Sequence, residues 1–206
     1  MMTDAKISSE VATASKDDQR HHDRCTSYLD ETLRTNITVH KLMDSISALG
    51  CKIPTDFMVC RKCDGDISGG FLVETEKNKD YKPQIVICQN KPYNKNMFQH
   101  TVIHELVHAY DMCKSQLDWK NCLHHACTEV RASTISGECN FIPELLRGKV
   151  QIDNGMPNCV KRRAEVSVSS NPYCKDIAKD AVEAVFPKCY NDLSPYGSIR
   201  SVNEVP

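Results

Sequence analysis

Apolar residues first recur with a helical period in the part of the chain around residues 25–49. Leu29, Leu33, Ile46 and Leu49 belong to a series spaced roughly three or four positions apart, the spacing of the buried face of an amphipathic helix. Gly50 follows directly, and glycine is the residue that most often ends a helix. The pattern therefore predicts a helix over about 25–49.

Two short runs rich in β-branched residues come next. Residues 71–75 follow a Gly-Gly pair, residues 84–88 read Gln-Ile-Val-Ile-Cys, and the charged stretch 77–82 separates the two runs. Such runs bounded by turn-forming residues are typical of strands. We expect a strand at each run and an irregular segment before them, from Ile53-Pro54 onward.

Helical periodicity returns after Pro92 and continues almost to the end of the chain. It predicts helices at 95–113 and 123–136, the second closed by Gly137, and a short apolar piece at 141–146. Two further helices are expected at 157–168 and 172–186, each with proline near its first turn and the last one ended by Pro187. One helix, two strands and then several helices predict an α+β fold.

The polar composition of the first residues sets the expected limits of the folded region. Residues 1–24 contain few large apolar side chains and no periodicity, so we expect a disordered tail there. This tail lacks the apolar core of a secretory signal and is too acidic for a transit peptide. The remaining chain is long enough for one domain, expected at 25–190, followed by a C-terminal tail at 191–206. A net charge of −1 gives no reason to expect a nucleic-acid partner.

Twelve cysteines are spread over the whole expected domain. An even number at this density is typical of disulfide-linked proteins from oxidising compartments. The alternative is a structural zinc site, but Cys60 and Cys63 form the only Cys-x-x-Cys pair, and a four-cysteine site needs a second one. We expect the cysteines to form disulfides. For Cys60 and Cys63 the choice between a disulfide and a zinc site stays the most open. Oxidised cysteines without a secretory signal point to the mitochondrial intermembrane space.

The helix expected at 95–113 carries the pattern His-Glu-x-x-His as His104, Glu105 and His108. Residues four apart lie on one face of a helix, so the two imidazoles can bind one Zn²⁺. Glu105 can then act as general base toward water at the metal. The alternative is a solvated helix face that happens to hold two histidines. A buried site is favoured because apolar residues surround the pattern: Ile103, Leu106, Val107 and Tyr110.

A catalytic zinc site requires a third protein ligand. Glu129 is the candidate, because it lies 21 residues after His108 on the helix expected to fold back against the first. Asp111 near the end of the first helix is the main rival, and His124 and His125 are further ones. Glu129 could also be a surface carboxylate near Arg131. A rival that is not a ligand can still orient a zinc-bound histidine from outside the coordination sphere.

Four cysteines lie around these two helices and are expected to form disulfides that fix the adjoining loops. They are Cys113, Cys122, Cys127 and Cys139.

The strand expected at 84–88 directly precedes the His-Glu-x-x-His helix. In zinc proteases that carry the His-Glu-x-x-His pattern, an edge strand above the metal pairs with the extended substrate through main-chain hydrogen bonds. The strand therefore has two interpretations, a substrate-binding edge strand or a plain buried strand.

Several segments taken in order resemble one known family. They are His104-Glu-Leu-Val-His-Ala-Tyr-Asp111, Asp118-Trp119, His124-His-Ala-Cys-Thr-Glu-Val-Arg-Ala132, Ser136-Gly-Glu-Cys139, Cys159-Val-Lys-Arg-Arg-Ala164 and Asn171-Pro-Tyr-Cys174. Together they are similar to the mitochondrial inner-membrane-associated metalloproteases that process and help assemble F-type ATP synthase, a family that includes a vertebrate Ku-binding protein. The resemblance runs from about Cys25 to the region of Cys189.

The resemblance implies a single zincin-like metalloprotease domain with a small sheet and several helices, stapled by disulfides. It implies a location in the intermembrane space, peripheral to the inner membrane. His104, Glu105 and His108 match the family's zinc ligands and catalytic glutamate, so Zn²⁺ is the expected cofactor. Two roles follow from the resemblance: removal of the propeptide of ATP synthase subunit 6, whose precursor would be the substrate, and help in assembling the membrane sector.

Two non-enzymatic interpretations compete with the protease. One is an assembly chaperone that uses the fold without cutting, and the other is a cytosolic or nuclear Ku-interacting protein. A glutamate between two metal ligands favours the enzyme, because binding alone does not need it. The cysteine content argues against the cytosol or nucleus, where thiols are kept reduced.

Overall fold

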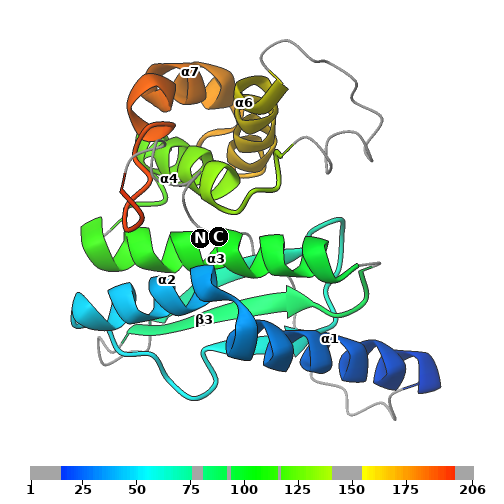
Figure 1. The fold of residues 1–206 in the computed structure, drawn as a ribbon. Coiled ribbons are helices and arrows are strands. Elements are labelled where there is room, and N and C mark those ends of the chain that lie inside the picture. Colours follow the sequence, from blue (N-terminus) through cyan, green and yellow to red (C-terminus); the bar gives the residue numbers. More distant parts are fainter. Residues whose placement is uncertain (1–14, 76–80, 92–93, 116, 141–154, 198–206) are drawn as a thin grey trace. The chain divides into compact units, whose positions relative to one another are not determined.

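The computed structural model describes residues 15–75, 81–91, 94–115, 117–140 and 155–197. The chain divides into two compact units, an N-terminal unit formed by residues 2–110 and a C-terminal unit that contains residues 111–206. The boundary falls within one helix, α3 (Lys95–Ser115). Figure 1 shows the course of the chain.

The N-terminal unit begins with helix α1 (Lys16–Thr35), which starts earlier than the sequence pattern predicts. The side chain of Ser15 accepts a hydrogen bond from the Asp18 N–H, and the first turn carries two aspartates, so this end is well capped. The expected tail at 1–24 is therefore wrong for residues 16–24. Their polar character reflects an exposed helix face, while Cys25 and Leu29 on the same helix are buried. Residues 1–14 lie outside the described part of the chain.

Asn36 separates α1 from helix α2 (Ile37–Ala48), where a single helix was expected. Its backbone N–H bonds to the Thr32 carbonyl and closes α1, while its side chain accepts from the Val39 N–H and opens α2. One asparagine thus caps two helices, which the continuous apolar periodicity does not reveal. Gly50 follows α2 with φ +84°, as expected for a helix stop.

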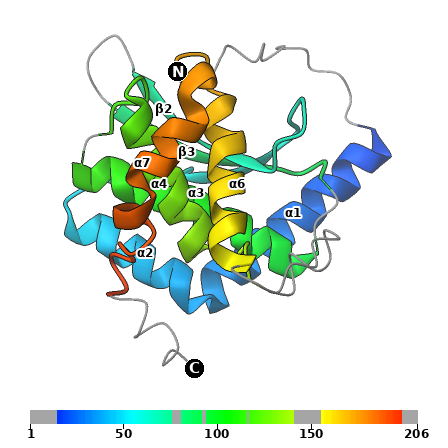
Figure 2. The same ribbon diagram turned by 90° about the horizontal axis from the view of Figure 1, so that it is seen from above.

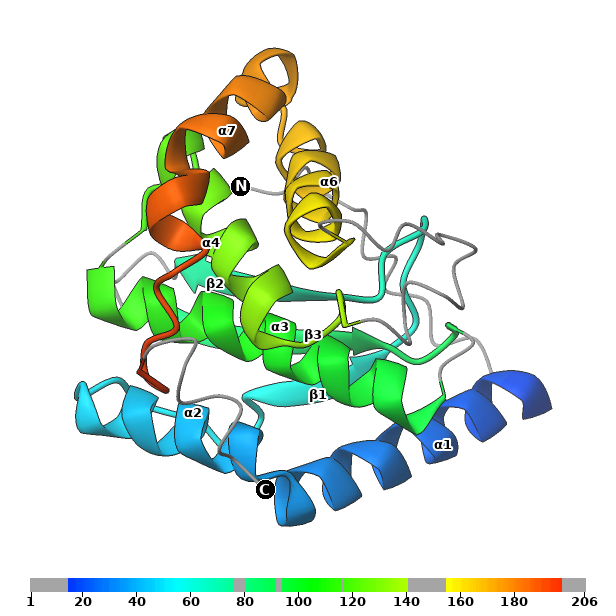
Figure 3. The ribbon, with the colours of Figure 1, turned by 45° about the horizontal axis from the view of Figure 1, so that its top comes forward.

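The sheet has the strand order β1-β3-β2. Strands β2 (Gly69–Thr75) and β3 (Tyr81–Cys88) confirm the two predicted strands and pair antiparallel, with Phe71 opposite Ile85. Strand β1 (Met58–Arg61) pairs parallel to β3 and lies in the segment expected to be irregular. Figure 3 shows β3 between the two others.

The position of β3 decides between the two interpretations of the strand at 84–88. It is the central strand, and its residues Ile85, Ile87 and Cys88 are fully buried. A central strand has both edges paired, so 84–88 is the plain buried strand of the two interpretations and not a substrate-binding edge strand. The outer strands of the described sheet are β1 and β2.

The described part of the C-terminal unit contains the last residues of α3 and three helices that pack on one another. These are α4 (Cys122–Ile135), α6 (Gly155–Ser169) and α7 (Ala178–Cys189), and a 3-10 turn, η1 (Lys175–Ile177), precedes α7. Figure 2 shows α6 and α7 side by side. The fully buried valines Val130, Val160, Val168 and Val182 lie in their shared core.

The four helices predicted after Pro92 are confirmed, with two differences. Helix α7 starts at Ala178, so residues 175–177 form the η1 turn where the start of the helix was expected. Pro187 lies inside α7, which continues to Cys189. The apolar piece at 141–146 lies outside the described residues.

Disulfides link elements within each unit, and the structure contains no free cysteine among the described residues. In the N-terminal unit, Cys25–Cys60 ties α1 to β1, and Cys63–Cys88 ties the loop after β1 to the end of β3. Cys60 and Cys63 thus pair with different partners. The Cys-x-x-Cys sequence is neither a disulfide loop nor part of a zinc site.

Three bridges in the C-terminal unit surround α4. Cys122–Cys174 joins its first residue to the loop before η1, Cys127–Cys189 joins it to the end of α7, and Cys139–Cys159 joins the loop after it to α6. Cys51 and Cys113 are disulfide-bonded as well. The expected disulfide framework around α4 is confirmed.

None of the helices in the described part of the chain combines the length and the apolar character that crossing a bilayer requires.

Candidate active site

Helix α3 places the two histidines of the His-Glu-x-x-His pattern next to each other. The ring centroids of His104 and His108 are 4.8 Å apart, with the ring planes at 78°. His108 is 4% exposed and Glu105 is 7% exposed. The pattern is therefore not a solvated helix face, and its two imidazoles can share one metal ion.

Strand β2 begins directly beside Glu105. A Cβ placed on Gly69 would lie 3.3 Å from Glu105 Oε1, 3.0 Å from Thr101 Cγ2 and 3.0 Å from the Val86 carbonyl oxygen. The absence of a side chain at Gly69 thus permits the strand to approach the helix at the level of the glutamate. The sequence offered one signal, a Gly-Gly pair at the start of a strand, but nothing in it linked this pair to Glu105.

Glu129 lies on α4 in the C-terminal unit and is 4% exposed. Its Oε1 accepts a hydrogen bond of 2.6 Å from Ser167 Oγ and lies 3.3 Å from His125 Nε2. A carboxylate at this depth is costly without such partners. Glu129 is therefore not the surface carboxylate that was the alternative interpretation.

The two histidine rivals of Glu129 have other surroundings. His124 is exposed, and its Nδ1 accepts a hydrogen bond from the Asp118 N–H. His125 is buried with both ring nitrogens engaged, Nε2 by Glu129 and Nδ1 by the Asn171 side-chain amide. His125 is thus a hydrogen-bonding neighbour of Glu129, whereas His124 faces solvent.

The remaining rival, Asp111, is held in a buried ion pair with Arg131 of α4. Arg131 Nε lies 3.0 Å from both carboxylate oxygens, and Thr128 Oγ1 donates to Oδ2 at 2.8 Å. Burial raises the pKa of the Asp111 carboxyl above its ordinary value, against the opposing effect of Arg131. Both oxygens of Asp111 are occupied by donors, which leaves them poorly placed to bind a metal.

Arg131 also holds the segment that follows α7. Its guanidinium donates to the carbonyls of Asp192 and Ser194 and lies 2.7 Å from Asp192 Oδ1. Burial lowers the pKa of Arg131, but the charges of Asp111 and Asp192 outweigh it, so the net shift is upward. The guanidinium therefore stays charged and joins α3, α4 and the C-terminal segment.

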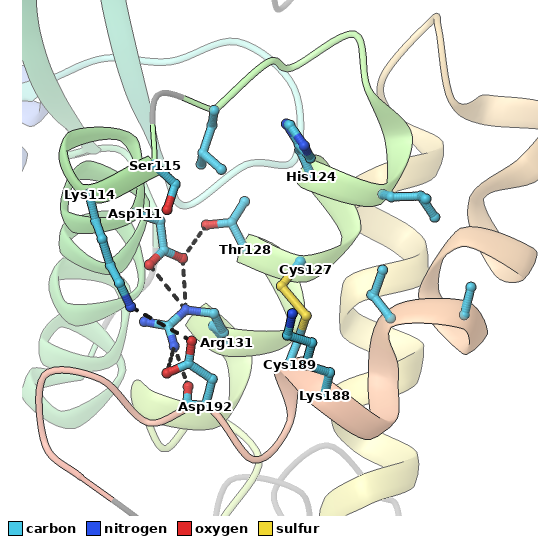
Figure 4. A pocket seen from close by; sticks show the side chains of 14 residues that line it. Asp111, Lys114, Ser115, His124, Cys127, Thr128, Arg131, Lys188, Cys189 and Asp192 are labelled. Carbon is cyan, nitrogen blue, oxygen red and sulfur yellow. Dashed lines mark hydrogen bonds and ion pairs between the residues drawn. A yellow bond between two sulfur atoms is a disulfide. The ribbon is translucent and has the colours of Figure 1, made fainter.

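Figure 4 shows this ion-pair network at the side of a shallow cavity of about 380 Å³. The Cys127–Cys189 disulfide lies in its wall, and Lys114 and Lys188 add positive charge. The cavity belongs to the C-terminal unit alone and is lined by none of His104, Glu105 and His108.

Comparison with known proteins shows to which protein family the chain belongs. The model of the peptidase M76 family matches residues 23–197. The chain belongs to the peptidase M76 family. This membership makes it a metallopeptidase, as the His-Glu-x-x-His pattern predicts.

Curated relatives in this family carry consistent names. A Homo sapiens protein named mitochondrial inner membrane protease ATP23 homolog is 38% identical, over 85% of this chain and 70% of its own length. The mitochondrial inner membrane proteases ATP23 of Yarrowia lipolytica and Schizosaccharomyces pombe are 40% and 37% identical. The alignments cover 79% and 77% of this chain, and 63% and 83% of those proteins. No solved structure matches the chain significantly.

Proposed function

We propose that this protein is a zinc endopeptidase of the mitochondrial intermembrane space, peripheral to the inner membrane. In this proposal it removes the propeptide of ATP synthase subunit 6 and assists assembly of the membrane sector. The observation that carries the enzymatic part is a buried Glu105 between two paired imidazoles in a chain of the M76 family. The names of the relatives support the mitochondrial inner membrane as its place of action.

The disulfides support an oxidising compartment. All twelve cysteines of the sequence lie in described segments, and none of them is free. Stable disulfides in this number are typical of compartments such as the intermembrane space and rare in the cytosol and nucleus. The Ku-interacting alternative is disfavoured for this reason.

His104, His108 and Glu129 would hold the metal. Two imidazoles and one carboxylate form a donor set that can hold a metal ion, and three protein ligands are what catalytic zinc sites use. The residues fit this role because both imidazoles lie close together on one helix and the carboxylate is buried and hydrogen-bonded. Zinc supplies Lewis acidity, which polarises a peptide carbonyl and acidifies water.

Glu105 would move the proton in peptide hydrolysis. As a carboxylate it accepts a proton from the attacking water and passes it to the departing amine nitrogen. Its low exposure keeps bulk water away from the group and strengthens its interaction with the charge that develops. Glu105 therefore acts as general base first and as general acid second.

Strand β2 would hold the substrate, in place of the central strand β3. In the described sheet β2 pairs with β3 along one edge only, and its first residue lies beside Glu105. An extended peptide can add to the other edge through main-chain hydrogen bonds. This arrangement would bring the scissile bond next to the general base.

Zinc content and cleavage of a subunit 6 precursor peptide test the proposal together. We expect Glu105→Gln to keep zinc and fold, and to lower cleavage by roughly 10²–10⁴, the usual effect of losing a general base. His104→Ala and His108→Ala should lose zinc, because each leaves too few ligands. His124→Ala is the matched control: this exposed histidine should affect neither quantity. Cleavage by Glu105→Gln at the wild-type rate would refute the mechanism.

A further inference from the structure

We propose that Ser167, His125 and Asn171 are positioning residues that orient the Glu129 carboxylate for the metal. The inference rests on the proposed function, in which Glu129 is the third ligand. All of these residues belong to the C-terminal unit. Ser167 lies on α6, His125 and Glu129 lie one turn apart on α4, and Asn171 lies in the loop after α6.

The orientation of the Asn171 amide is fixed by two backbone groups. Its Nδ2 donates to the Trp119 carbonyl at 2.8 Å, and its Oδ1 accepts from the Tyr173 N–H at 3.0 Å. A carbonyl can only accept and a backbone N–H can only donate, so the two ends of the amide cannot be exchanged. Nδ2 is therefore the amide atom that lies 3.1 Å from His125 Nδ1.

This amide in turn fixes the tautomer of His125. Because Asn171 Nδ2 can only donate, His125 Nδ1 must accept, and the proton of the neutral ring is on Nε2. Nε2 then donates to Glu129 Oε1 at 3.3 Å. The Trp119 ring packs edge-on against the imidazole, with centroids 5.3 Å apart, and limits its rotation.

Ser167 acts on the same carboxylate oxygen. Its hydroxyl donates to Glu129 Oε1 at 2.6 Å, so two donors from different elements converge on one oxygen. Two hydrogen bonds to one oxygen set the rotation of the carboxylate and direct Oε2 as the coordinating oxygen. The chain of contacts from Asn171 through His125 to Glu129 would thus prepare the ligand before the metal arrives.

The first test measures zinc affinity by competition with a chelator. Ser167→Ala should weaken zinc binding 10- to 100-fold, as is typical for residues that support a metal ligand. Ser167→Thr keeps the hydroxyl and should restore wild-type affinity. Ser169→Ala is the control on the same helix, because this exposed hydroxyl donates only to the Val166 carbonyl. Wild-type affinity in Ser167→Ala would overturn the proposal.

The second test changes the hydrogen bonds of the Asn171 side chain without changing its size. Asn171→Asp replaces the amide that donates to the Trp119 carbonyl and to His125 Nδ1 by a carboxylate, so Nδ1 must carry a proton to bond to it and the hydrogen bond from Nε2 to Glu129 Oε1 is altered. Asn121→Asp is the control, because the Asn121 side chain only accepts, from the N–H groups of Leu123 and His124. In the Co²⁺-substituted protein, the visible absorption bands should shift in Asn171→Asp and stay unchanged in Asn121→Asp. Identical spectra in both variants would contradict the orienting role.

Glu129→Gln separates this inference from the proposed function. If Glu129 is a ligand, the substitution weakens zinc binding, and adding Ser167→Ala to it has no further effect, since the serine acts only through that carboxylate. An undiminished effect of Ser167→Ala in that background would overturn the positioning role and leave the ligand in place. Wild-type zinc affinity in Glu129→Gln alone would overturn the ligand assignment, and with it this inference. Thermal unfolding of each variant identifies losses that come from misfolding.

Discussion

A single glycine controls how closely strand β2 approaches Glu105. Gly69 leaves room where a methyl group would contact a backbone oxygen, a threonine methyl and the carboxylate itself. Two of these neighbours are rigid or packed, so the strand or the helix must move to admit a side chain. The spacing between the strand and Glu105, the proposed general base, therefore depends on a residue with no chemistry of its own.

Gly69→Ala should reduce peptide cleavage about 10- to 100-fold, because small misplacements of a catalytic group have effects of that size. Overpacking should also lower the free energy of unfolding by about 1–3 kcal/mol. The zinc content should stay at the wild-type level. Gly70→Ala is the control, since a Cβ at that position meets nothing within 4 Å. Equal activities of the two alanine variants would show that the contact with Glu105 is unimportant.

The site residues that could be predicted from sequence are those that lie within one helical turn of one another. His104, Glu105 and His108 follow from helical geometry alone, because four residues make about one turn. The partners of Glu129 do not: Ser167 lies 38 residues from it, and Asn171 lies 46 residues from His125. Such contacts depend on how helices pack, and a serine or asparagine carries no signal of them.

At the scale of elements, Arg131 connects α4 with both the end of α3 and the segment after α7. The Asp192 carboxylate takes part through Arg131 and through two hydrogen bonds from Ser194. Burial raises the pKa of Asp192, but the Ser194 hydrogen bonds and the Arg131 charge outweigh it and shift it below its ordinary value of 3.8. The ionised form therefore stabilises the folded unit.

Asp192→Asn should lower the free energy of unfolding by about 1 kcal/mol at neutral pH, the size expected for a partly exposed charged pair. A pKa that is lower in the folded state gives stability above the ordinary value, and this stability disappears as pH falls through the lowered value. The difference between wild type and variant should thus shrink below about pH 3.8. Denaturant unfolding over this range measures it, with the exposed Asp44→Asn as control. A difference that does not change with pH would contradict the assignment to this carboxylate.

Helices and strands whose own sequence shows a clear periodicity were predicted. Elements that form only through contacts with other parts of the chain were not. Strands β2 and β3 and helices α3 and α4 carry clear periodicity, whereas β1 has only four residues and exists by pairing with β3. The strand order cannot be read from either strand alone, so the sequence left open whether β3 is an edge strand or a buried one. The start of α1 was missed because its first turns are polar and are stabilised by a cap and by contacts such as Arg24 with the Lys91 carbonyl.

At the scale of the whole molecule, the disulfides distinguish an oxidised enzyme from a reduced binding protein. Alkylation without reductant should add no label to the native protein, and alkylation after full reduction should add twelve, as read by intact mass. Each bridge should contribute about 2–4 kcal/mol, mainly by restricting the unfolded chain. Labelling of most cysteines without reductant, in protein folded under oxidising conditions, would reopen the cytosolic interpretation.

Cells that lack the protein can separate cutting from assembly. Glu105→Gln removes only the proton transfer, because the substitution preserves size and leaves His104 and His108 in place. We expect the subunit 6 precursor to accumulate uncut, while ATP synthase assembly is largely retained, since binding a partner requires no general base. His108→Ala, which should lose the metal, tests in parallel whether assembly needs a metal-loaded site.

Loss of both processing and assembly in Glu105→Gln, at normal protein level and zinc content, would mean that assembly depends on the cut itself. Normal processing in that variant would mean that another protease removes the propeptide.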